Sequence, residues 1–119
     1  MGYAIEAWDI PSLPVAGSLD RYPVRRIYCI GRNYAAHARE MGADEKEPPF
    51  FFLKPADAIV DDGATIPYPA ATTNLHYEGE LVVAMGRRGR DIAAADANGY
   101  VFGYGVGIDL TRRDLQDQA

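Results

Sequence analysis

Apolar and polar side chains alternate along two stretches in the second half of the chain. Residues 78–85 begin with acidic side chains at alternate positions, and residues 100–108 alternate glycine with aromatic or aliphatic side chains. Because successive side chains of a strand point to opposite faces, both stretches are predicted to be strands. A Gly-Arg-Arg-Gly turn over 86–89 and a short helix over 92–97, capped by Asp91, are predicted between them.

The first half of the chain has shorter apolar runs that are broken by proline and glycine. A strand is predicted over 26–30, followed by a helix over 33–41. Three further short strands are predicted over 50–53, 58–60 and 65–66.

The two ends of the chain complete the predicted organisation. Residues 1–25 carry three prolines and are interpreted as an N-terminal arm that leads into a domain over 26–119. The last helix is predicted to begin at Thr111, with Asp114 three residues later forming an approximate capping box. The elements do not alternate as regular βαβ units, so the predicted fold class is α+β and rich in strands.

Length, charge and cysteine content narrow the class of protein. A chain of 119 residues has room for one domain, and 48% hydrophobic with 24% charged residues is typical of a folded protein. The 17 acidic and 12 basic residues give a net charge of −5, which disfavours nucleic acid and anionic membranes as partners. The single cysteine, Cys29, argues against an internal disulfide and a thiolate zinc cluster. Without a membrane-spanning apolar run or a signal-peptide pattern, the protein is expected in the cytoplasm.

Three ionisable side chains at alternate positions, His76, Glu78 and Glu80, are predicted to share one face of a strand. Two carboxylates beside an apolar run repel each other and resist burial unless a cation neutralises them. Mg²⁺, Mn²⁺ and Ca²⁺ prefer such oxygen ligands. The alternative is the solvated face of an edge strand, which the spacing of the two glutamates alone favours.

Three glycines, Gly103, Gly105 and Gly107, are predicted to share one face of the other strand, and Asp109 continues that face. Because glycine weakens a strand, this pattern indicates that something approaches the backbone closely. Asp109 could therefore complete a three-carboxylate site with the two glutamates. Tight sheet packing, with Asp109 as a helix cap, explains the pattern equally well. The run is not a dinucleotide-binding fingerprint, because Ile108 occupies the third glycine position.

Other side chains could contribute chemistry beside such a site. On a helix, His37 and Glu40 would face the same side, and a carboxylate beside an imidazole favours a water-activating base. Arg113 and Gln116 have the same spacing and could hold a carboxylate. Lys54 follows an apolar run and could also point into a site. The alternatives are a surface pair for His37 and Glu40, and solvated charges for the basic residues.

Four segments of the chain, taken together and in this order, match the pattern of a known family. They are Ile30-Gly31-Arg32-Asn33-Tyr34 with His37 and Glu40, Phe52-Leu53-Lys54-Pro55, Asn74-Leu75-His76-Tyr77-Glu78-Gly79-Glu80-Leu81, and Gly107-Ile108-Asp109-Leu110-Thr111-Arg112-Arg113-Asp114. In combination they resemble the fumarylacetoacetate hydrolase family. Residues 22–29, which lead into Gly31, are similar to the fumarylpyruvate hydrolases of gentisate breakdown.

The resemblance implies roles for the candidate residues. Glu78, Glu80 and Asp109 would ligate Mg²⁺ or Mn²⁺, with Ca²⁺ as a possible occupant in crystals. His37, oriented by Glu40, would activate water on a lid helix. Substrate binding is assigned to Arg113 and Gln116, with Arg32, Tyr34 and Lys54 as further candidates.

The resemblance also implies a reaction, which is hydrolysis of the carbon–carbon bond of an acylpyruvate. The metal would hold the 2-oxo-carboxylate end, water activated by His37 would attack the distal ketone, and pyruvate would leave as an enolate. Fumarylpyruvate would give fumarate and pyruvate. Oxaloacetate decarboxylation and enol–keto isomerisation in the same family use the same metal site and are alternatives. A homodimer is expected, because family members are generally dimers.

The resemblance implies a mixed β-barrel or roll, of which this chain would be the N-terminal half. Family catalytic domains continue past the last matching segment, through further strands and a lysine near the metal. We therefore expect a truncated chain with exposed strand edges and apolar surface. The alternative to an enzyme is an inactive fragment that binds a divalent ion or pairs with a second chain.

Overall fold

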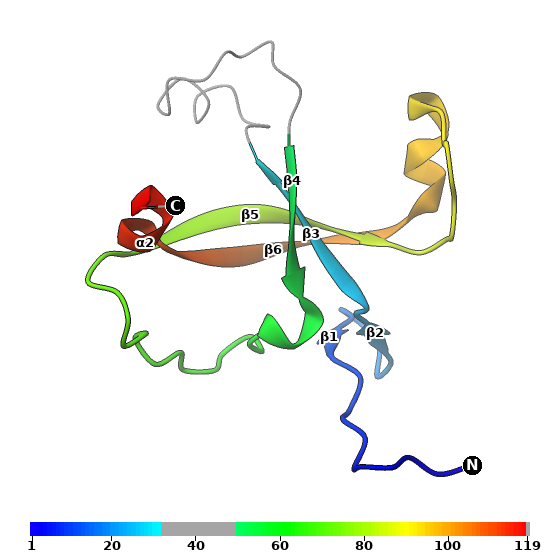
Figure 1. The fold of residues 1–119 in the computed structure, drawn as a ribbon. Helices are drawn as coiled ribbons and strands as arrows, with labels where there is room; N and C mark the ends of the chain where they lie inside the picture. Colours follow the sequence, from blue (N-terminus) through cyan, green and yellow to red (C-terminus); the bar gives the residue numbers. More distant parts are fainter. Residues whose placement is uncertain (32–49, 119) are drawn as a thin grey trace. The chain divides into compact units, whose positions relative to one another are not determined.

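The computed structural model describes residues 1–31 and 50–118 (Figure 1). The chain divides into two compact units, Met1–Ile66 and Pro67–Ala119. Strands make up most of the regular structure, and the described helices are short. The helix predicted over 33–41 lies outside the described residues.

The first unit contains two antiparallel pairs of strands. β1 (Ser12–Pro14) pairs with β2 (Arg21–Pro23), and β3 (Arg26–Gly31) pairs with β4 (Phe50–Pro55). Exposed and half-buried residues alternate along β3, as expected of a strand with two unlike faces. The strands that the sequence pattern predicted at the positions of β3 and β4 are confirmed.

The two further strands predicted in this unit, over 58–60 and 65–66, are wrong. A 3₁₀ helix, η1 (Ala56–Ala58), follows β4, and the chain then continues without regular structure. The Ala64 N–H donates to the Asp61 carbonyl at 3.1 Å, which closes a turn in which Gly63 has a φ of 81°. This turn lies between the two short apolar runs, and neither run pairs with a strand within the described residues 1–31 and 50–118.

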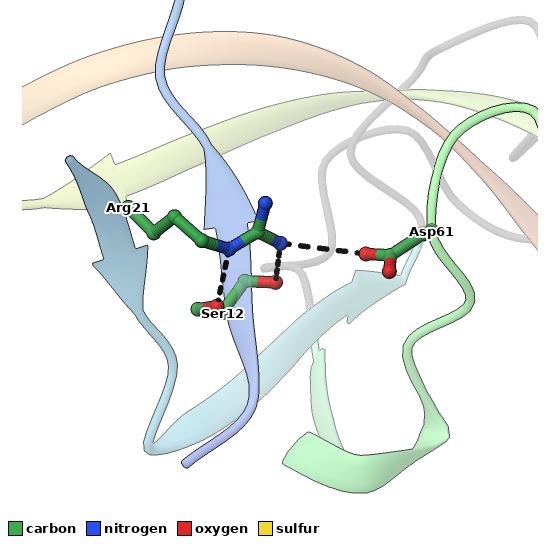
Figure 2. Close-up of polar contacts among 3 residues, drawn as sticks. All are labelled: Ser12, Arg21 and Asp61. Carbon is green, nitrogen blue, oxygen red and sulfur yellow. Dashed lines mark hydrogen bonds and ion pairs between the residues drawn. The ribbon is translucent and has the colours of Figure 1, made fainter. Parts of the chain in front are cut away.

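The Arg21 side chain links the β1–β2 pair to the loop after η1 (Figure 2). Its Nε donates to Ser12 Oγ at 2.7 Å, its Nη2 donates to the Ser12 carbonyl at 3.0 Å, and Nη2 lies 3.5 Å from Asp61 Oδ1. Since both charged side chains are exposed, the ion pair contributes about 1 kcal/mol or less. Val24 is the only buried hydrophobic residue among the described ranges, so little apolar packing supports this unit.

The second unit is built on a long antiparallel ribbon of two strands (Figure 1). β5 (Leu75–Met85) pairs with β6 (Val101–Arg112) along its whole length, with one irregularity near Met85. A 3₁₀ helix, η2 (Ala94–Tyr100), lies in the connection between the strands, and α2 (Arg113–Gln118) follows β6. Both strands were predicted and are confirmed, and both are longer than the alternation indicated.

The predicted helix starts in this unit are wrong. Thr111 lies within β6 opposite His76, so its backbone belongs to the strand ladder and α2 begins only at Arg113. Asp91 lies before η2 with a φ of 50°, and Ala93, the residue at the cap position, makes no side-chain cap bond. Aspartate tolerates this left-handed conformation better than most residues, which suits Asp91 to the irregular connection.

The pairing of β5 with β6 gives the ribbon two unlike faces. One face carries the candidate carboxylates and the glycines of β6. The other face is apolar, and its large side chains are exposed: Tyr77, Leu81, Val83, Tyr104, Val106 and Ile108. The expected exposed apolar surface is therefore present. Within residues 1–31 and 50–118 the strands form three separate two-stranded sheets and close no barrel. None of the helices in the described part of the chain has the length and apolar character of a membrane span.

Hydrogen bonds from the segment before β5 fix the first turn of α2. The buried Thr72 hydroxyl donates to Asp114 Oδ1, and the Thr73 N–H donates to Asp114 Oδ2 at 3.1 Å. The Arg113 N–H donates to the Asn74 carbonyl at 2.9 Å. The Thr72 hydroxyl, followed by the Thr73 N–H, lowers the pKa of Asp114 below its ordinary value of 3.8 by favouring the ionised carboxyl. Asp114 is thus an anchor of α2 and not a partner of Thr111 in a capping box.

We predict that Asp114→Asn destabilises the protein at neutral pH and that the difference from wild type disappears in acid. Because the folded-state pKa is lowered, the ionised carboxyl stabilises the fold above pH 3.8 and this contribution is lost as the pH falls through the lower folded-state value. Urea unfolding of both proteins over this pH range measures the effect, with the exposed Asp96→Asn as a matched control. A difference that persists undiminished at the lowest pH contradicts the prediction.

Candidate metal centre

The register of β5 against β6 brings acidic residues from distant parts of the sequence together. Glu78 lies directly opposite Asp109, and Glu80 lies opposite Gly107. Residues two apart on one strand share a face, so Glu80 is the diagonal neighbour of Asp109 on the same side of the ribbon. The strand pairing therefore places three acidic residues on one patch of one face.

The carboxylates of Glu78, Glu80 and Asp109 converge on a small volume. One carboxylate oxygen of each residue lies within 4.8 Å of the other two. Oxygens on opposite sides of one ion lie about 4.2 Å apart for Mg²⁺ and about 5 Å apart for Ca²⁺, so this donor set fits a hard divalent cation. All three residues are half-buried, whereas a solvated strand face would leave them exposed. Repulsion among three half-buried carboxylates is a further reason to expect a cation.

Gly107 leaves room for this convergence. A Cβ at Gly107 would lie 3.0 Å from Val82 Cγ2, which is tighter than an ordinary contact. Since Gly107 has no side chain opposite Glu80, the Glu80 carboxylate can lean toward Asp109. Gly105 and Gly103 are less constrained, because a Cβ would be 3.9 Å from Val82 Cβ at Gly105 and would meet nothing within 4 Å at Gly103. The close approach predicted from three glycines is thus present at one of them.

Arg113, at the start of α2, forms an ion pair with one of the three carboxylates. Its Nη2 lies 3.0 Å from Glu78 Oε1, and the two side chains are 24% and 33% exposed. The guanidinium supplies one positive charge at the edge of a cluster of three negative charges. Its Nε is buried and has no hydrogen-bond partner among the described residues. One donor of the Arg113 fork is therefore left for a further acceptor.

The remaining candidates lie in the second unit, in the first unit or outside the described residues. In the second unit, His76 is exposed and is not part of the carboxylate cluster, and Gln116 lies on α2, three residues after Arg113, and is exposed. Lys54 is half-buried in β4, in the first unit. The others lie outside the described residues: Arg32, Tyr34, His37 and Glu40.

Sequence reasoning missed two contacts of this centre. It placed Arg113 beside the site as a carboxylate binder but did not predict its pairing with Glu78, 35 residues away. It also missed Thr72, which holds α2 through Asp114. No local spacing signals either contact, because both depend on how the segment before β5 and the residues after β6 come together.

An open hollow of about 680 Å³ lies elsewhere on this unit, at the connection between β5 and β6. It is lined by residues 87–100 in part, including Arg87, whose guanidinium lies 4.3 Å from the centre of the Tyr100 ring. None of the sequence-predicted site residues lines it. Carboxylate chemistry, and not the size of this hollow, identifies the candidate centre.

Comparison with known proteins identifies the family of this chain. Residues 26–119 match the model of the fumarylacetoacetate (FAA) hydrolase C-terminal family. The crystal structure of fumarylpyruvate hydrolase from Pseudomonas aeruginosa in complex with Mn²⁺ and pyruvate is 54% identical, with a TM-score of 0.90, over 98% of this chain and 52% of that chain.

Two curated relatives are named for other activities. Oxaloacetate tautomerase FAHD1, mitochondrial, of Bos taurus is 47% identical over 94 residues, which is 79% of this chain and 42% of that protein. Oxaloacetate decarboxylase, mitochondrial, of Dictyostelium discoideum is 43% identical over 96 residues, which is 80% of this chain and 44% of that protein. The chain thus spans about half the length, or less, of the relatives it matches. Because the family match includes most of its residues, the chain belongs to the fumarylacetoacetate hydrolase family.

Proposed function

We propose that the protein takes part in metal-dependent hydrolysis of the carbon–carbon bond of an acylpyruvate, and that fumarylpyruvate is its substrate. The observation that carries the proposal is the convergence of Glu78, Glu80 and Asp109 within 4.8 Å. The Pseudomonas aeruginosa fumarylpyruvate hydrolase, 54% identical, was crystallised with Mn²⁺ and pyruvate, and pyruvate is a product of the proposed reaction.

The three carboxylates are proposed to hold Mg²⁺ or Mn²⁺, and Ca²⁺ would suit the same oxygen donors. When bound, the cation would supply Lewis acidity that polarises a 2-oxo-carboxylate and stabilises a developing enolate. Glu78, Glu80 and Asp109 are half-buried and close together, so their negative charges repel one another. The main effect of a bound cation would be to neutralise this charge.

The chain's own basic residues are proposed to hold the substrate. The Nε–H of Arg113, which has no hydrogen-bond partner among the described residues, suits one oxygen of a carboxylate, and Gln116 follows three residues later on α2. Lys54, Arg32 and Tyr34 are further candidates for this role. A dicarboxylic acylpyruvate offers an acidic group at each end, so more than one cationic contact is useful.

His37 is proposed to take a proton from water, with Glu40 holding its imidazole in the required orientation. The water oxygen would attack the distal ketone carbon, and the electrons of the broken carbon–carbon bond would pass to the departing pyruvate. The methylene carbon that leaves with pyruvate then takes a proton and becomes the methyl group of pyruvate. The ketone carbon that water attacked becomes a carboxylate of fumarate. Both residues lie outside the described part of the chain, and their roles rest on the family resemblance.

A second candidate is tautomerisation or decarboxylation of oxaloacetate. It is favoured by the Bos taurus tautomerase at 47% identity and by the Dictyostelium discoideum decarboxylase at 43%. Both reactions pass through an enolate beside a 2-oxo-carboxylate, so the same carboxylate cluster would serve them. A chain that binds the cation without turnover, or that pairs with a second chain, is the alternative from another class.

Several broader features belong to the proposal as well. We propose that residues 26–119 form the N-terminal portion of a catalytic domain of barrel or roll type, preceded by an arm over 1–25. A homodimer acting in gentisate breakdown is likewise proposed from the resemblance, and the cytoplasm stays the proposed location. The two curated relatives named above are mitochondrial, so location is a separate question from chemistry.

Removal of divalent cations from the full-length protein is predicted to abolish turnover of fumarylpyruvate. The carboxylate cluster without a cation offers no Lewis acid, and its negative charge repels an anionic substrate. Exhaustive chelation followed by an assay, and then by addition of Mg²⁺ or Mn²⁺, measures loss and recovery. Turnover that survives chelation would count against the mechanism.

The substitution Glu80→Gln is predicted to raise the Kd for Mn²⁺ by at least about tenfold, because a neutral amide replaces a charged ligand. Titration calorimetry on the full-length protein measures the affinity. Asp96→Asn, in the strand connection, makes the same chemical change away from the cluster and is expected to leave the Kd unchanged. Equal affinities for the two variants would remove Glu80 from the proposed ligand set.

A substrate panel separates the two candidate reactions. We predict that kcat/KM is highest for fumarylpyruvate, lower for acetylpyruvate, which lacks the second carboxylate, and lowest for oxaloacetate. The measurement is initial rates on the metal-loaded full-length protein. A preference for oxaloacetate would instead establish the second candidate.

A further inference from the structure

The ion pair between Arg113 and Glu78 places a cationic side chain on a proposed metal ligand. Arg113 Nη2 lies 3.0 Å from Glu78 Oε1, and an oxygen of Glu78 belongs to the set that converges within 4.8 Å. Both side chains are largely shielded from solvent, at 24% and 33% exposure, so their charges are incompletely screened. The guanidinium therefore offsets part of the negative charge of the cluster.

A divalent cation and this guanidinium make opposing demands on Glu78. Arginine remains charged at every accessible pH, so it cannot become neutral when a second cation arrives. Two positive centres that share one carboxylate repel each other, and each lowers the electron density that the carboxylate offers the other. A bound cation and an intact Arg113–Glu78 pair thus destabilise one another.

The unused donor of Arg113 indicates where the side chain can bind instead. Its Nε is buried without a partner among the described residues, and a buried donor without an acceptor is unfavourable. Glu78 uses Nη2 alone. A free carboxylate can accept from Nε and Nη2 together, which satisfies both donors of one edge of the guanidinium.

We propose that Arg113 and the divalent cation compete for Glu78, so that cation binding frees the guanidinium to take a substrate carboxylate. This rests on the proposed function and adds to it an order of binding, cation first and acid second. Cation binding and the Arg113–Glu78 ion pair weaken each other by the same factor, because coupling between two binding events is reciprocal. Loss of Arg113 is therefore expected to lower the Kd for the cation by that factor. Arg113 would then be a temporary counter-ion of the empty cluster.

The opposite role for Arg113 makes the sign of the effect decisive. If the guanidinium instead orients Glu78 as a ligand, its removal weakens cation binding, as loss of a supporting contact around a metal site does. If Arg113 competes with the cation, replacing Arg113 tightens cation binding. If Arg113 orients Glu78, replacing it weakens cation binding. One titration distinguishes them.

The test is calorimetric titration of Mn²⁺ into the metal-free full-length protein. Arg113→Met, which removes the charge and keeps an unbranched side chain, is expected to lower the Kd about tenfold relative to Arg112→Met, about 1.4 kcal/mol. Arg112 is the matched control, because it removes the same charge from an exposed position on the other face of the ribbon. An Arg113→Met affinity equal to or weaker than that of the control overturns the proposal.

A second measurement needs no stable variant. The Nε–H resonance of Arg113 in the wild-type protein is expected to shift on addition of Mg²⁺, with the midpoint that calorimetry gives for Mg²⁺. A resonance that does not move while Mg²⁺ binds overturns the competition and leaves the metal centre standing. If the wild-type protein binds no divalent cation, the proposed function and this inference fall together.

Discussion

The pairing of Glu78 with Asp109 across β5 and β6 is the constraint on which the candidate centre depends. Like charges directly opposite each other in a sheet destabilise it, and Glu80 adds a third negative charge on the same face. The ribbon tolerates this because its ladder is long and because Arg113 supplies a local positive charge. A locally unfavourable arrangement inside an otherwise regular element is typical of a functional site.

The strands β3 to β6 and the two faces of the ribbon could be predicted from the sequence, because the two-residue period of a strand is a local property. The short strands β1 and β2 were missed, because they lie in residues 1–25, which were interpreted as an arm. The starts of the helices could not be predicted in this way, because they depend on which groups the backbone N–H and C=O of those residues hydrogen-bond to. Thr111 is a residue type that often caps helices, but its backbone pairs with His76 in the strand ladder, so α2 begins only at Arg113. The strand predicted over 65–66 failed for a related reason, since no strand within residues 1–31 and 50–118 pairs with it.

The candidate site was predictable in part. The alternation of side chains along a strand predicted Glu78 and Glu80 on one face, and Asp109 on the glycine face of another strand. The register that pairs these two strands could not be predicted from either segment alone. The partners of Arg113 and Thr72 depend on that register and on the course of the chain before β5. His37 and Glu40 stay predictions, because they lie outside the described residues.

The regular alternation of the two ribbon faces from Leu75 to Ala84 also limits how this segment can change in length. Adding or deleting one residue within β6 would rotate Asp109 to the side that carries Tyr104 and Val106 and would bring a hydrophobic residue opposite Glu78. The connection that contains η2 is free of that requirement, because it carries none of the proposed ligands. Insertions and deletions compatible with the centre are therefore expected in the hairpin connection or at the neighbouring irregularity near Met85, and the regularly paired part of the strands tolerates substitution only.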